Sequence, residues 1–552
     1  MKMTTKGIAA ALCAGLAMTA FADSDHANHT VPSMKTQMQS VESLTRLAEN
    51  EPTDATIRMK LALALDSVGM HEEAEWWRAE AMEINPEIAT NGLIETGEEI
   101  PIEDLMARGA GVGSVCDAPV GPDVIIGSLH ELRRWGQSGG ITSYSVGTTS
   151  CNIGDERLDW FDNVASRHPV IAQDMFKWEP FSVGDDNGRF KQLGQSWLKH
   201  GFFALSNNLC CPSCAGTVGN QLGIGCADPY GAGLNGSFSE LGPRSEVDGS
   251  DGSFPEPHSS PSGNSTLRGR IQVVNTELDQ ANAINADSQY LVDGLYLAND
   301  DAIAGNDNNN AAYRTINVSS SGTTHTISFQ GGTQREAAAI QHWREIEPGV
   351  TLRFIDVPGD GRYIVGYNAS DNGDGTWHYE YGVYNLTSED ACNDFTIPVA
   401  DGIVVTNISF YDVDCHSGEP YDNTDWTGVR TTSTVSWSAP AGSASTNNAI
   451  RWGTMYNFGF DADEGPLDVS IDLGQNSGGS SPAFNVSAPD PAGATPPCPG
   501  DINNDGTVDT ADLGALIAVF GTMNNHIDLN GDGLVDTADL GILIANFGPC
   551  PM

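Results

Sequence analysis

The sequence contains few basic residues. Only 26 lysines and arginines accompany 73 aspartates and glutamates among 552 residues, which gives a formal net charge of −47. A chain with this charge repels nucleic acid and anionic lipid, so neither is an expected partner. It suits a saline or calcium-containing medium, in which the charge is screened. Because 39% of the residues are hydrophobic, most of the chain is nevertheless expected to fold.

Long hydrophobic runs are also absent beyond the N-terminus. No later stretch is apolar for the roughly 18 residues that a membrane helix needs, so no membrane span is predicted. The N-terminus has the pattern of a secretory signal, because Lys2 and Lys6 form a positive region before the apolar stretch Gly7–Phe21, and Ala20-Phe21-Ala22 offers a cleavage site. We expect residues 1–22 to be removed and the protein to be secreted, extracellular or associated with the cell surface. Loss of the two lysines changes the net charge from −47 to −49.

Several signatures of catalytic sites are missing. The sequence has no Gly-x-x-x-x-Gly-Lys loop for phosphate and no His-Glu-x-x-His motif for zinc. The paired carboxylates of a glycoside hydrolase cannot be singled out among 73 acidic residues. The catalytic residues, if the protein is an enzyme, are therefore unknown from the sequence.

Two nearly identical acidic segments lie near the C-terminus, the first starting at Asp501 and the second, 27 residues later, at Asp528. Oxygen-bearing side chains occupy loop positions 1, 3, 5, 9 and 12, glycine occupies position 6, and position 7 offers a backbone carbonyl. Calcium requires this set of hard oxygen ligands, and the glycine permits the sharp turn between them. The spacing therefore predicts two calcium ions, with a solvated acidic loop as the alternative. The expected ligands are Asp501, Asn503, Asp505, Thr507, Asp509 and Asp512, and Asp528, Asn530, Asp532, Leu534, Asp536 and Asp539.

The details of these loops resemble one family of calcium modules. Position 12 is aspartate in both copies, and each loop is followed by one short apolar helix, expected at Leu513–Phe520 and Leu540–Phe547. In these features residues 498–550 resemble the type I dockerin, a small all-α, EF-hand-like module. The resemblance implies two calcium ions and a cohesin-like or other surface protein as partner. Cys498 and Cys550 bracket the unit, and their position predicts a disulfide.

The resemblance also indicates where the partner binds. Loop positions 10 and 11 carry partner contacts in this family, and here they match Thr510, Ala511, Thr537 and Ala538. Since the two copies are identical at these positions, either face is expected to bind. Further along each helix, Ile517-Ala518 and Ile544-Ala545 replace the basic residues that the family usually has.

The cysteines agree with export. Without Cys13, ten of the eleven cysteines remain, and they form even groups: six between Cys116 and Cys226, the pair Cys392 and Cys415, and the pair Cys498 and Cys550. An even number in each group is expected of separately folding domains with internal disulfides.

The remaining chain is predicted to be multidomain and mainly β, with a small helical part. Residues 23–39 are predicted to be disordered, and residues 40–92 to form a helical hairpin that resembles a single tetratricopeptide repeat. One such repeat cannot bury its own apolar face, so it either packs on the next domain or serves as a docking handle. Residues 115–349 are predicted to form a β-rich domain with cysteines, 350–474 an antiparallel β-sandwich, and 475–497 a Gly/Ser/Pro linker.

One candidate site combines histidine and cysteine. His168 and His200 precede a cluster of Cys210, Cys211, Cys214 and Cys226. Disulfides, a zinc or copper site and a redox Cys-x-x-Cys pair are three interpretations of the cysteines. His200 is either a hydrogen-bonded, partly buried side chain or a metal ligand.

A second candidate site is aromatic. Trp377, Tyr379 and Tyr381 alternate along one predicted strand, so their rings project from one face. They either stack on sugars as a glycan-binding row or fill the core of the sandwich. The sequence thus predicts a secreted, modular, calcium-binding protein with a body that binds glycan or protein. A secreted polysaccharide hydrolase is the alternative, and a metal-dependent oxidase is a more remote one.

Overall fold

The computed structural model describes residues 119–181, 188–413 apart from 202, 418–490, 499–502, 507–522, 527–530 and 534–550. It also describes six residues of the predicted helical hairpin, which are helical and buried: Arg58, Leu61, Ala62, Leu65, Trp77 and Ala81. The predicted signal peptide, the segment 23–39 and the rest of the hairpin lie outside the described residues. Within the described part of the chain, no helix is long and apolar enough to cross a membrane.

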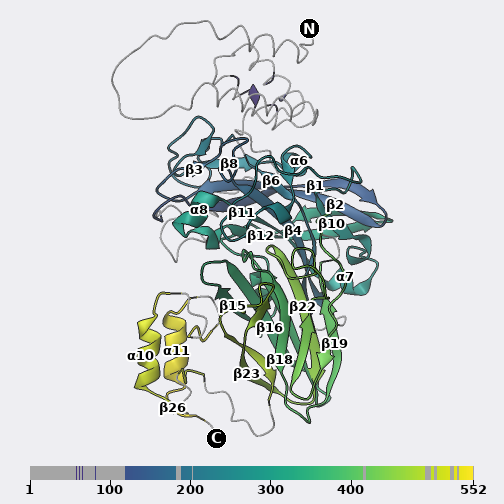
Figure 1. Ribbon diagram of the computed structural model, residues 1–552, viewed down its shortest axis with the longest axis vertical. Coiled ribbons are helices and arrows are strands. Elements are labelled where there is room, and N and C mark those ends of the chain that lie inside the picture. The colour runs from purple at the N-terminus through teal and green to yellow at the C-terminus, as the bar shows by residue number, and fades with distance from the viewer. Residues whose placement is uncertain are drawn as a thin grey trace.

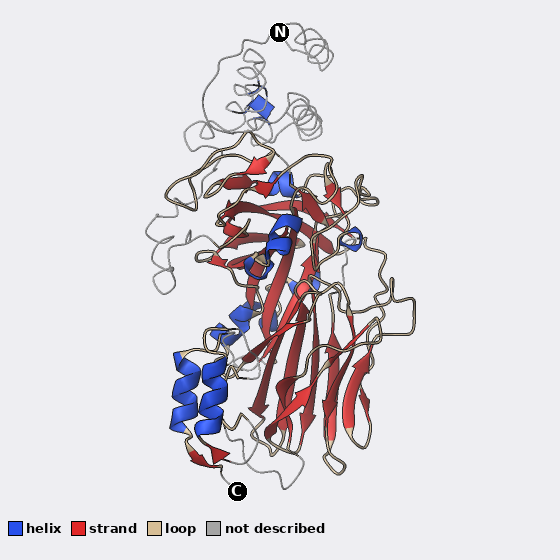
Figure 2. Ribbon diagram, turned by 60° about the vertical axis from the view of Figure 1, so that its left-hand side comes forward, coloured by secondary structure: helices blue, strands red, loops and turns tan. Residues whose placement is uncertain are grey.

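The body is mainly β, as predicted, and every described strand pair in it is antiparallel (Figures 1 and 2). The first sandwich begins with a hairpin in which Gly139 and Gly140, both with positive φ, form the two-residue turn. Its smaller sheet contains β1 (Val124–Ser138), β2 (Ile141–Asn152), β10 (Ile271–Val274) and β8 (Ala227–Tyr230).

The larger sheet of the first sandwich has the order β13-β12-β11-β4-β6-β9, with β14 paired to β12 and β5 to β4. These strands are β4 (Val170–Pro180), β5 (Gly188–Gln195), β6 (Leu198–His200), β9 (Leu241–Gly242), β11 (Gln289–Leu297), β12 (Ala311–Ser321), β13 (Thr324–Phe329) and β14 (Gln334–Arg335). β3 (Leu158–Asp159) and β7 (Gln221–Leu222) form a separate short pair. Apolar residues of both sheets, such as Ile126, Val146, Ile171 and Val292, form one buried core between them.

Short helices connect these strands. They are α6 (Ala232–Asn235), α7 (Ala283–Asp287), α8 (Asn299–Ala304) and α9 (Gln341–Ile346), with 3-10 turns η2 (Arg244–Glu246), η3 (Asn275–Glu277) and η4 (Asp307–Asn309).

The second sandwich has a five-stranded sheet in the order β15-β16-β17-β22-β19 and a four-stranded sheet in the order β20-β21-β18-β24. The strands are β15 (Thr351–Asp356), β16 (Arg362–Asp371), β17 (Trp377–Asn385), β18 (Cys392–Pro398), β19 (Val405–Tyr411), β20 (Val429–Arg430), β21 (Thr434–Ser438), β22 (Thr454–Ala462) and β24 (Leu473–Gln475). A further pair consists of β23 (Pro466–Ile471) and β25 (Phe484–Pro489).

The strand β25 corrects the predicted linker. Residues 475–497 were expected to be a flexible connection, but Phe484, Val486 and Ala488 are buried in the core of the second sandwich. These residues alternate with polar ones, which is the pattern of a half-buried strand. The Gly, Ser and Pro content around them obscured that pattern in the sequence.

The two sandwiches share a buried core, so the boundary at residue 349 does not separate two independent cores. Phe190 of the first sandwich and Tyr384 of the second belong to the same cluster, together with the fully buried Trp343. The side chain of Gln192 also makes two hydrogen bonds to the backbone at the start of β22. Its amide nitrogen donates to the carbonyl of Gly453 at 2.9 Å, and its oxygen accepts from the amide of Met455 at 2.9 Å.

The C-terminal unit is helical. It contains α10 (Thr510–Ala518), α11 (Thr537–Ala545) and the short strands β26 (Thr507–Val508) and β27 (Gly548–Pro549). Its small core consists of Val508, Leu516, Ile527, Val535 and Leu543.

Candidate functional site

Both helices of the C-terminal unit begin with the same capping arrangement. Asp509 precedes α10, and its side chain accepts a hydrogen bond from the amide of Ala511 at 2.7 Å. Asp536 precedes α11 and accepts from the amide of Ala538 at 2.7 Å. These aspartates, at position 9 of the predicted loops, satisfy backbone donors that a helix N-terminus leaves without a partner.

The aspartates at position 12 connect each helix to the start of its loop. Asp512 is fully buried, and its two carboxylate oxygens accept from the amides of Ile502 and Asp509, each at 2.8 Å. Asp539 is equally buried and accepts from Leu529 and Asp536, each at 2.7 Å. Each loop is therefore closed on itself by a carboxylate that bonds its second and ninth residues.

The two repeats complete one another. Val508 in the first loop pairs with Gly548, which follows the second helix. Val535 in the second loop bonds to Gly521 and Thr522, which follow the first helix, at 2.7 and 3.0 Å. Val535 and Gly548 lie 27 residues after Val508 and Gly521, so the two contacts are related by the sequence repeat.

The donor groups of the loops suit a hard cation. Asp501 is half-buried and Asp528 is almost fully buried, and both stand at position 1 of their loops. Thr507 and Leu534 stand at position 7, where a backbone carbonyl is the expected ligand, and Asn530 stands at position 3, where a side-chain oxygen is expected. Asn503, Asp505 and Asp532 lie outside the described residues. Every expected ligand atom is oxygen, which is the donor set that calcium prefers over zinc or copper.

Residues 499–548 match the family model described as the dockerin type I domain. The C-terminal unit is a dockerin type I module. Dockerin type I domains bind calcium and cohesins, and together with disulfides they are typical of extracellular modular proteins. No curated protein matches this chain.

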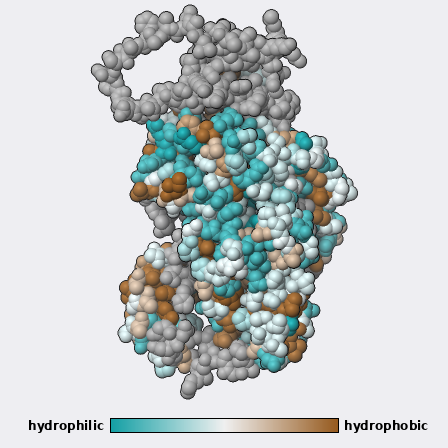
Figure 3. Space-filling model, in the orientation of Figure 1, coloured by the Kyte–Doolittle hydropathy of each residue, from teal (hydrophilic) through white to brown (hydrophobic). Residues whose placement is uncertain are grey.

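The four residues predicted to contact a partner are exposed in the dockerin module. Thr510, Ala511, Thr537 and Ala538 lie in the first turns of the two helices and are exposed. Two apolar pairs further along are exposed as well: Ile517 (59%) and Phe520 (43%) on the first repeat, and Ile544 (58%) and Phe547 (50%) on the second. Brown surface in Figure 3 covers part of this module. Phe520 and Phe547 were expected as the last residues of the two helices, but the helices end at Ala518 and Ala545, and both rings are exposed.

The aromatic row of the second sandwich is mostly internal. Tyr379 and Tyr381 are fully buried, and their hydroxyls donate to the carbonyls of Glu464 at 2.8 Å and Ser487 at 2.6 Å. Only Trp377 is partly exposed. A sugar cannot stack on the two tyrosines, so the three residues do not form a glycan-binding row. The alternation placed them on one face, and that face is the core.

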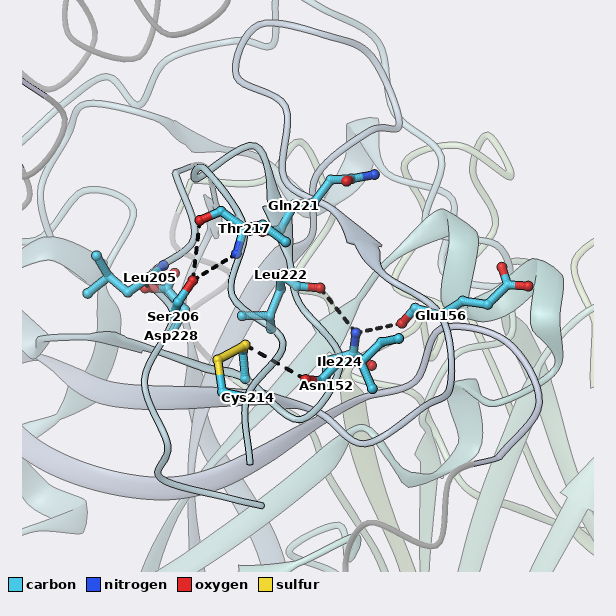
Figure 4. The surroundings of a disulfide bond; sticks show 11 residues. Asn152, Glu156, Leu205, Ser206, Cys214, Thr217, Gln221, Leu222, Ile224 and Asp228 are labelled. Carbon is cyan, nitrogen blue, oxygen red and sulfur yellow. Dashed lines mark hydrogen bonds between the residues drawn. A yellow bond between two sulfur atoms is a disulfide. The ribbon is translucent and has the colours of Figure 1, made fainter. Parts of the chain in front are cut away.

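The cysteine cluster forms disulfides. Cys151 is bonded to Cys210 and Cys214 to Cys226, and Cys211 is also disulfide-bonded. Figure 4 shows the Cys214–Cys226 bridge beside Asn152, whose side-chain amide donates to the carbonyls of Glu156 and Leu222 at 2.7 and 3.1 Å. These thiols are therefore not available as metal ligands or as a dithiol. Cys550 of the dockerin module is disulfide-bonded too.

Cys392 differs from the expectation of even, internally bonded groups. It is a free, fully buried cysteine, and burial raises the pKa of its thiol to about 12. Cys415, its expected partner, lies outside the described residues. Cys392 packs among the apolar side chains of the second sandwich as a small hydrophobic residue.

The structure brings His168 and His200 together. Nε2 of His168 lies 2.9 Å from Nδ1 of His200, and Nδ1 of His168 lies 2.8 Å from the carbonyl oxygen of Phe161. The carbonyl only accepts, so Nδ1 of His168 carries the hydrogen and its Nε2 accepts from His200. Burial lowers the pKa of His168 to about 4 and the pKa of His200 well below 6.5, so both rings are neutral.

A third histidine stacks on this pair. The rings of His200 and His258 are 4.0 Å apart and nearly parallel. Burial lowers the pKa of His258, but the hydrogen bonds to Glu240 and to the backbone of Ser259, with the charges of Glu240 and Glu256, outweigh it, and the net shift is upward. In the described part of the chain, no group of three or more His, Cys, Asp or Glu residues is arranged to hold a metal ion. His168 and His200 thus form a hydrogen-bonded, buried pair, which is the first of the two interpretations of His200.

Sequence reasoning missed a polar network on the five-stranded sheet. Arg189 of β5 donates to both carboxylate oxygens of Glu380 at 2.6 and 2.9 Å. His378 lies beside Glu380, and its Nδ1 is 2.7 Å from Asp461. His378 and Glu380 alternate on one strand, which is visible in the sequence, but Arg189 comes from the other sandwich and nothing in the sequence links them.

A serine motif was also overlooked. Gly136-Gln137-Ser138-Gly139-Gly140 has the Gly-x-Ser-x-Gly spacing of a nucleophile elbow, which requires a strand-to-helix turn. Here the segment is the hairpin between β1 and β2, and the Ser138 hydroxyl accepts a hydrogen bond from Asn264 at 2.9 Å. The context excludes this serine as a hydrolase nucleophile.

Proposed function

We propose that this protein is a secreted modular protein whose dockerin type I module attaches it, in a calcium-dependent way, to a cohesin-like partner, while the β-rich body binds glycan or protein. The observation that carries the proposal is the match of residues 499–548 to the dockerin family. The duplicated geometry of the two repeats supports it, because both present the same exposed residues.

We further propose that each loop holds one calcium ion. The buried carboxylates at position 12 bond the loop backbone, and the first and ninth positions add further carboxylates. Without a cation these negative charges repel one another within a few residues, so calcium binding and folding of the loops are expected to be coupled. The signal peptide at residues 1–22 and a short linker ahead of Cys498 complete the proposed arrangement.

The exposed helix residues suggest an apolar contact with the partner. Each repeat exposes an isoleucine, which stands where the family usually has a basic residue, and a phenylalanine further along the chain. A partner surface for this module is therefore expected to be apolar at its centre, since burial of exposed aliphatic and aromatic area contributes most to such interfaces.

Binding of recombinant type I cohesin domains to the full chain, measured by titration calorimetry, tests this proposal. Binding is expected in calcium and not in excess chelator. Ile517→Ser and Ile544→Ser should each leave binding within about twofold because the other repeat remains, whereas the double variant should lose tenfold or more. Val404→Ser, at a body residue that is 58% exposed, is the matched control. Absence of binding to any cohesin in calcium would reject the cohesin-like partner.

A polysaccharide hydrolase is not the function that the structure supports best. Its reaction requires two carboxylates that a sugar can reach. Asp174 and Asp293 do lie opposite one another on β4 and β11, but both are almost fully buried. Arg244 bonds Asp174 at 2.8 Å, so this pair belongs to the core between the sandwiches.

A further inference from the structure

Five side chains at one end of the first sandwich alternate between arginine and aromatic residues. The guanidinium carbon of Arg133 lies 3.9 Å from the ring centre of Trp135, and that of Arg270 lies 3.7 Å from the same ring. Arg270 is also 4.4 Å from the ring of Phe238, and Arg268 is 4.0 Å from it. Arg133, Trp135, Arg270, Phe238 and Arg268 together form an arginine–aromatic stack.

The distances fix the order of the stack. Two guanidinium groups cannot both lie about 4 Å above the same ring face, because they would overlap. Arg133 and Arg270 therefore occupy opposite faces of Trp135, and Arg270 and Arg268 occupy opposite faces of Phe238. No ring face in the stack is left for a base or a sugar to stack on, so a ligand meets the N–H groups of the arginines.

The surrounding fold holds the centre of the stack rigidly. Trp135 lies on β1, and its Nε1 donates to the hydroxyl of Ser145 on β2 at 2.8 Å. Gly236, just after α6, permits this approach, because a Cβ there would lie 2.5 Å from Nε1 of Trp135. Arg270 is buried and donates to the carbonyls of Gly236, Ser265 and Thr266 at 2.8 to 2.9 Å. In Figure 1 the elements β1, β2, β10 and α6 gather in this part of the sandwich.

The two ends of the stack lack an acidic partner. Among the described residues, neither Arg133 nor Arg268 forms a salt bridge, and Nε of Arg268 is buried without a hydrogen-bond partner. By contrast, Arg167, Arg189, Arg244 and Arg362 each bond a carboxylate. In a chain with 73 acidic and only 26 basic residues, carboxylates are abundant, so the absence of a salt bridge at both Arg133 and Arg268 marks a local positive site at the two ends of the stack.

We infer that the arginine–aromatic stack binds the anionic groups, sulfate or carboxylate, of an acidic polysaccharide. Guanidinium groups match these planar or tetrahedral anions with paired hydrogen bonds, and stacking on rings fixes them in place beforehand. Single-stranded nucleic acid is disfavoured, because its binding relies on free aromatic faces, and all four are covered here. The inference rests on the proposed function of the body as a glycan-binding unit and specifies the class of glycan.

Binding of the full chain to polysaccharides by calorimetry tests the inference. The measurement is made in calcium at about 0.1 M ionic strength, where the Debye length is about 10 Å and the long-range repulsion between the acidic chain and an acidic polysaccharide is screened. The probes are heparin for sulfate, polygalacturonate for carboxylate, dextran and xylan as neutral chains, and an oligothymidylate as nucleic acid. We expect at least one acidic polysaccharide to bind more tightly than the neutral ones. The variant Arg133→Gln with Arg268→Gln should weaken that binding by about tenfold or more, because two charge-assisted contacts are lost.

Arg167→Gln is the matched control, because Arg167 also stacks on a ring, that of Phe161 at 4.1 Å, but bonds Asp159 at 2.8 Å. It should leave the affinity within about twofold, and thermal unfolding of each variant checks that the fold is intact. Unchanged affinity for the acidic polysaccharide in the double variant would overturn the inference. It would also be overturned if the oligothymidylate bound more tightly than the acidic polysaccharides and the double variant weakened that binding to the same extent. Binding of neutral chains alone would overturn the inference but retain a glycan-binding body. Binding of no polysaccharide would reject both the inference and a glycan-binding body, and would leave a protein as the partner of the body.

Discussion

Replacement of Asp512 by alanine is expected to raise the population of molecules in which the first helix of the dockerin module is unfolded, while the body stays folded. Its carboxylate is fully buried and accepts two backbone hydrogen bonds at 2.8 Å, from the second and ninth residues of its loop. The substitution removes the acceptor that both amides have in the protein, together with an expected calcium ligand.

The size of the effect follows from these two bonds. A hydrogen bond to a charged group contributes about 1.5–3 kcal/mol. Ile502 and Asp509 are only half-buried, so water can partly replace the carboxylate and the lower value applies to each. The total is about 3 kcal/mol, which corresponds to a roughly 100-fold rise in the population of the open state.

Hydrogen exchange of the full chain in excess calcium, followed by mass spectrometry, measures this population for residues 510–518 separately from the body. Protection of α10 should fall about 100-fold in the variant, and Asp539→Ala should do the same to α11 because Asp539 accepts equivalent bonds from Leu529 and Asp536. Thr510→Ala, at the exposed first residue of α10, is the control and should change protection little. Protection of α10 within threefold of the unaltered chain would refute the role assigned to Asp512.

Three further predictions concern other parts of the chain. Gly514→Ala and Gly541→Ala, in mid-helix positions where an added Cβ meets nothing within 4 Å, should each stabilise the dockerin module by about 0.5–1 kcal/mol in denaturant titration; destabilisation would show that the helix packing is misassigned. Cys392, whose thiol pKa is raised to about 12 by burial, should react with a maleimide at pH 8 only after unfolding. Peptide mapping by mass spectrometry locates the label, and labelling of Cys392 within minutes in the native protein would contradict its burial. Burial lowers the folded-state pKa of His168 to about 4, so its contribution to stability is present above the unfolded pKa and is lost as the pH falls from about 6.5 to about 4; its imidazole signals should not titrate between pH values of about 5.5 and 8 in nuclear magnetic resonance spectra.

The sequence allowed prediction of features whose residues are contiguous. The calcium loops place all their expected ligands within twelve positions, and the helix caps at Asp509 and Asp536 lie inside the same motif. The mainly antiparallel β body was predictable from strand-length runs separated by turn residues. Periodicity could not say which face of a strand is internal, so Tyr379 and Tyr381 were open to two interpretations until their burial was known.

Features that join distant segments were not predictable. Arg133 and Arg270 meet on Trp135 across more than a hundred residues, and Arg189 reaches Glu380 from another sandwich. The shared core around Trp343 likewise depends on how two sheets pack and not on any local pattern. Composition misled the assignment of residues 475–497, because small and polar residues around β25 concealed three buried side chains.

The reciprocal pairing in the dockerin module has a consequence for how such a unit can arise. Each loop is completed by the segment that follows the other repeat's helix, so a single 27-residue copy would expose an unpaired loop edge and half of a core. Two separate copies could satisfy one another only as a symmetric dimer with exchanged ends. The present chain has the geometry of that dimer within one polypeptide. Gene duplication followed by fusion is the simplest route from a dimer of single repeats to this two-repeat module.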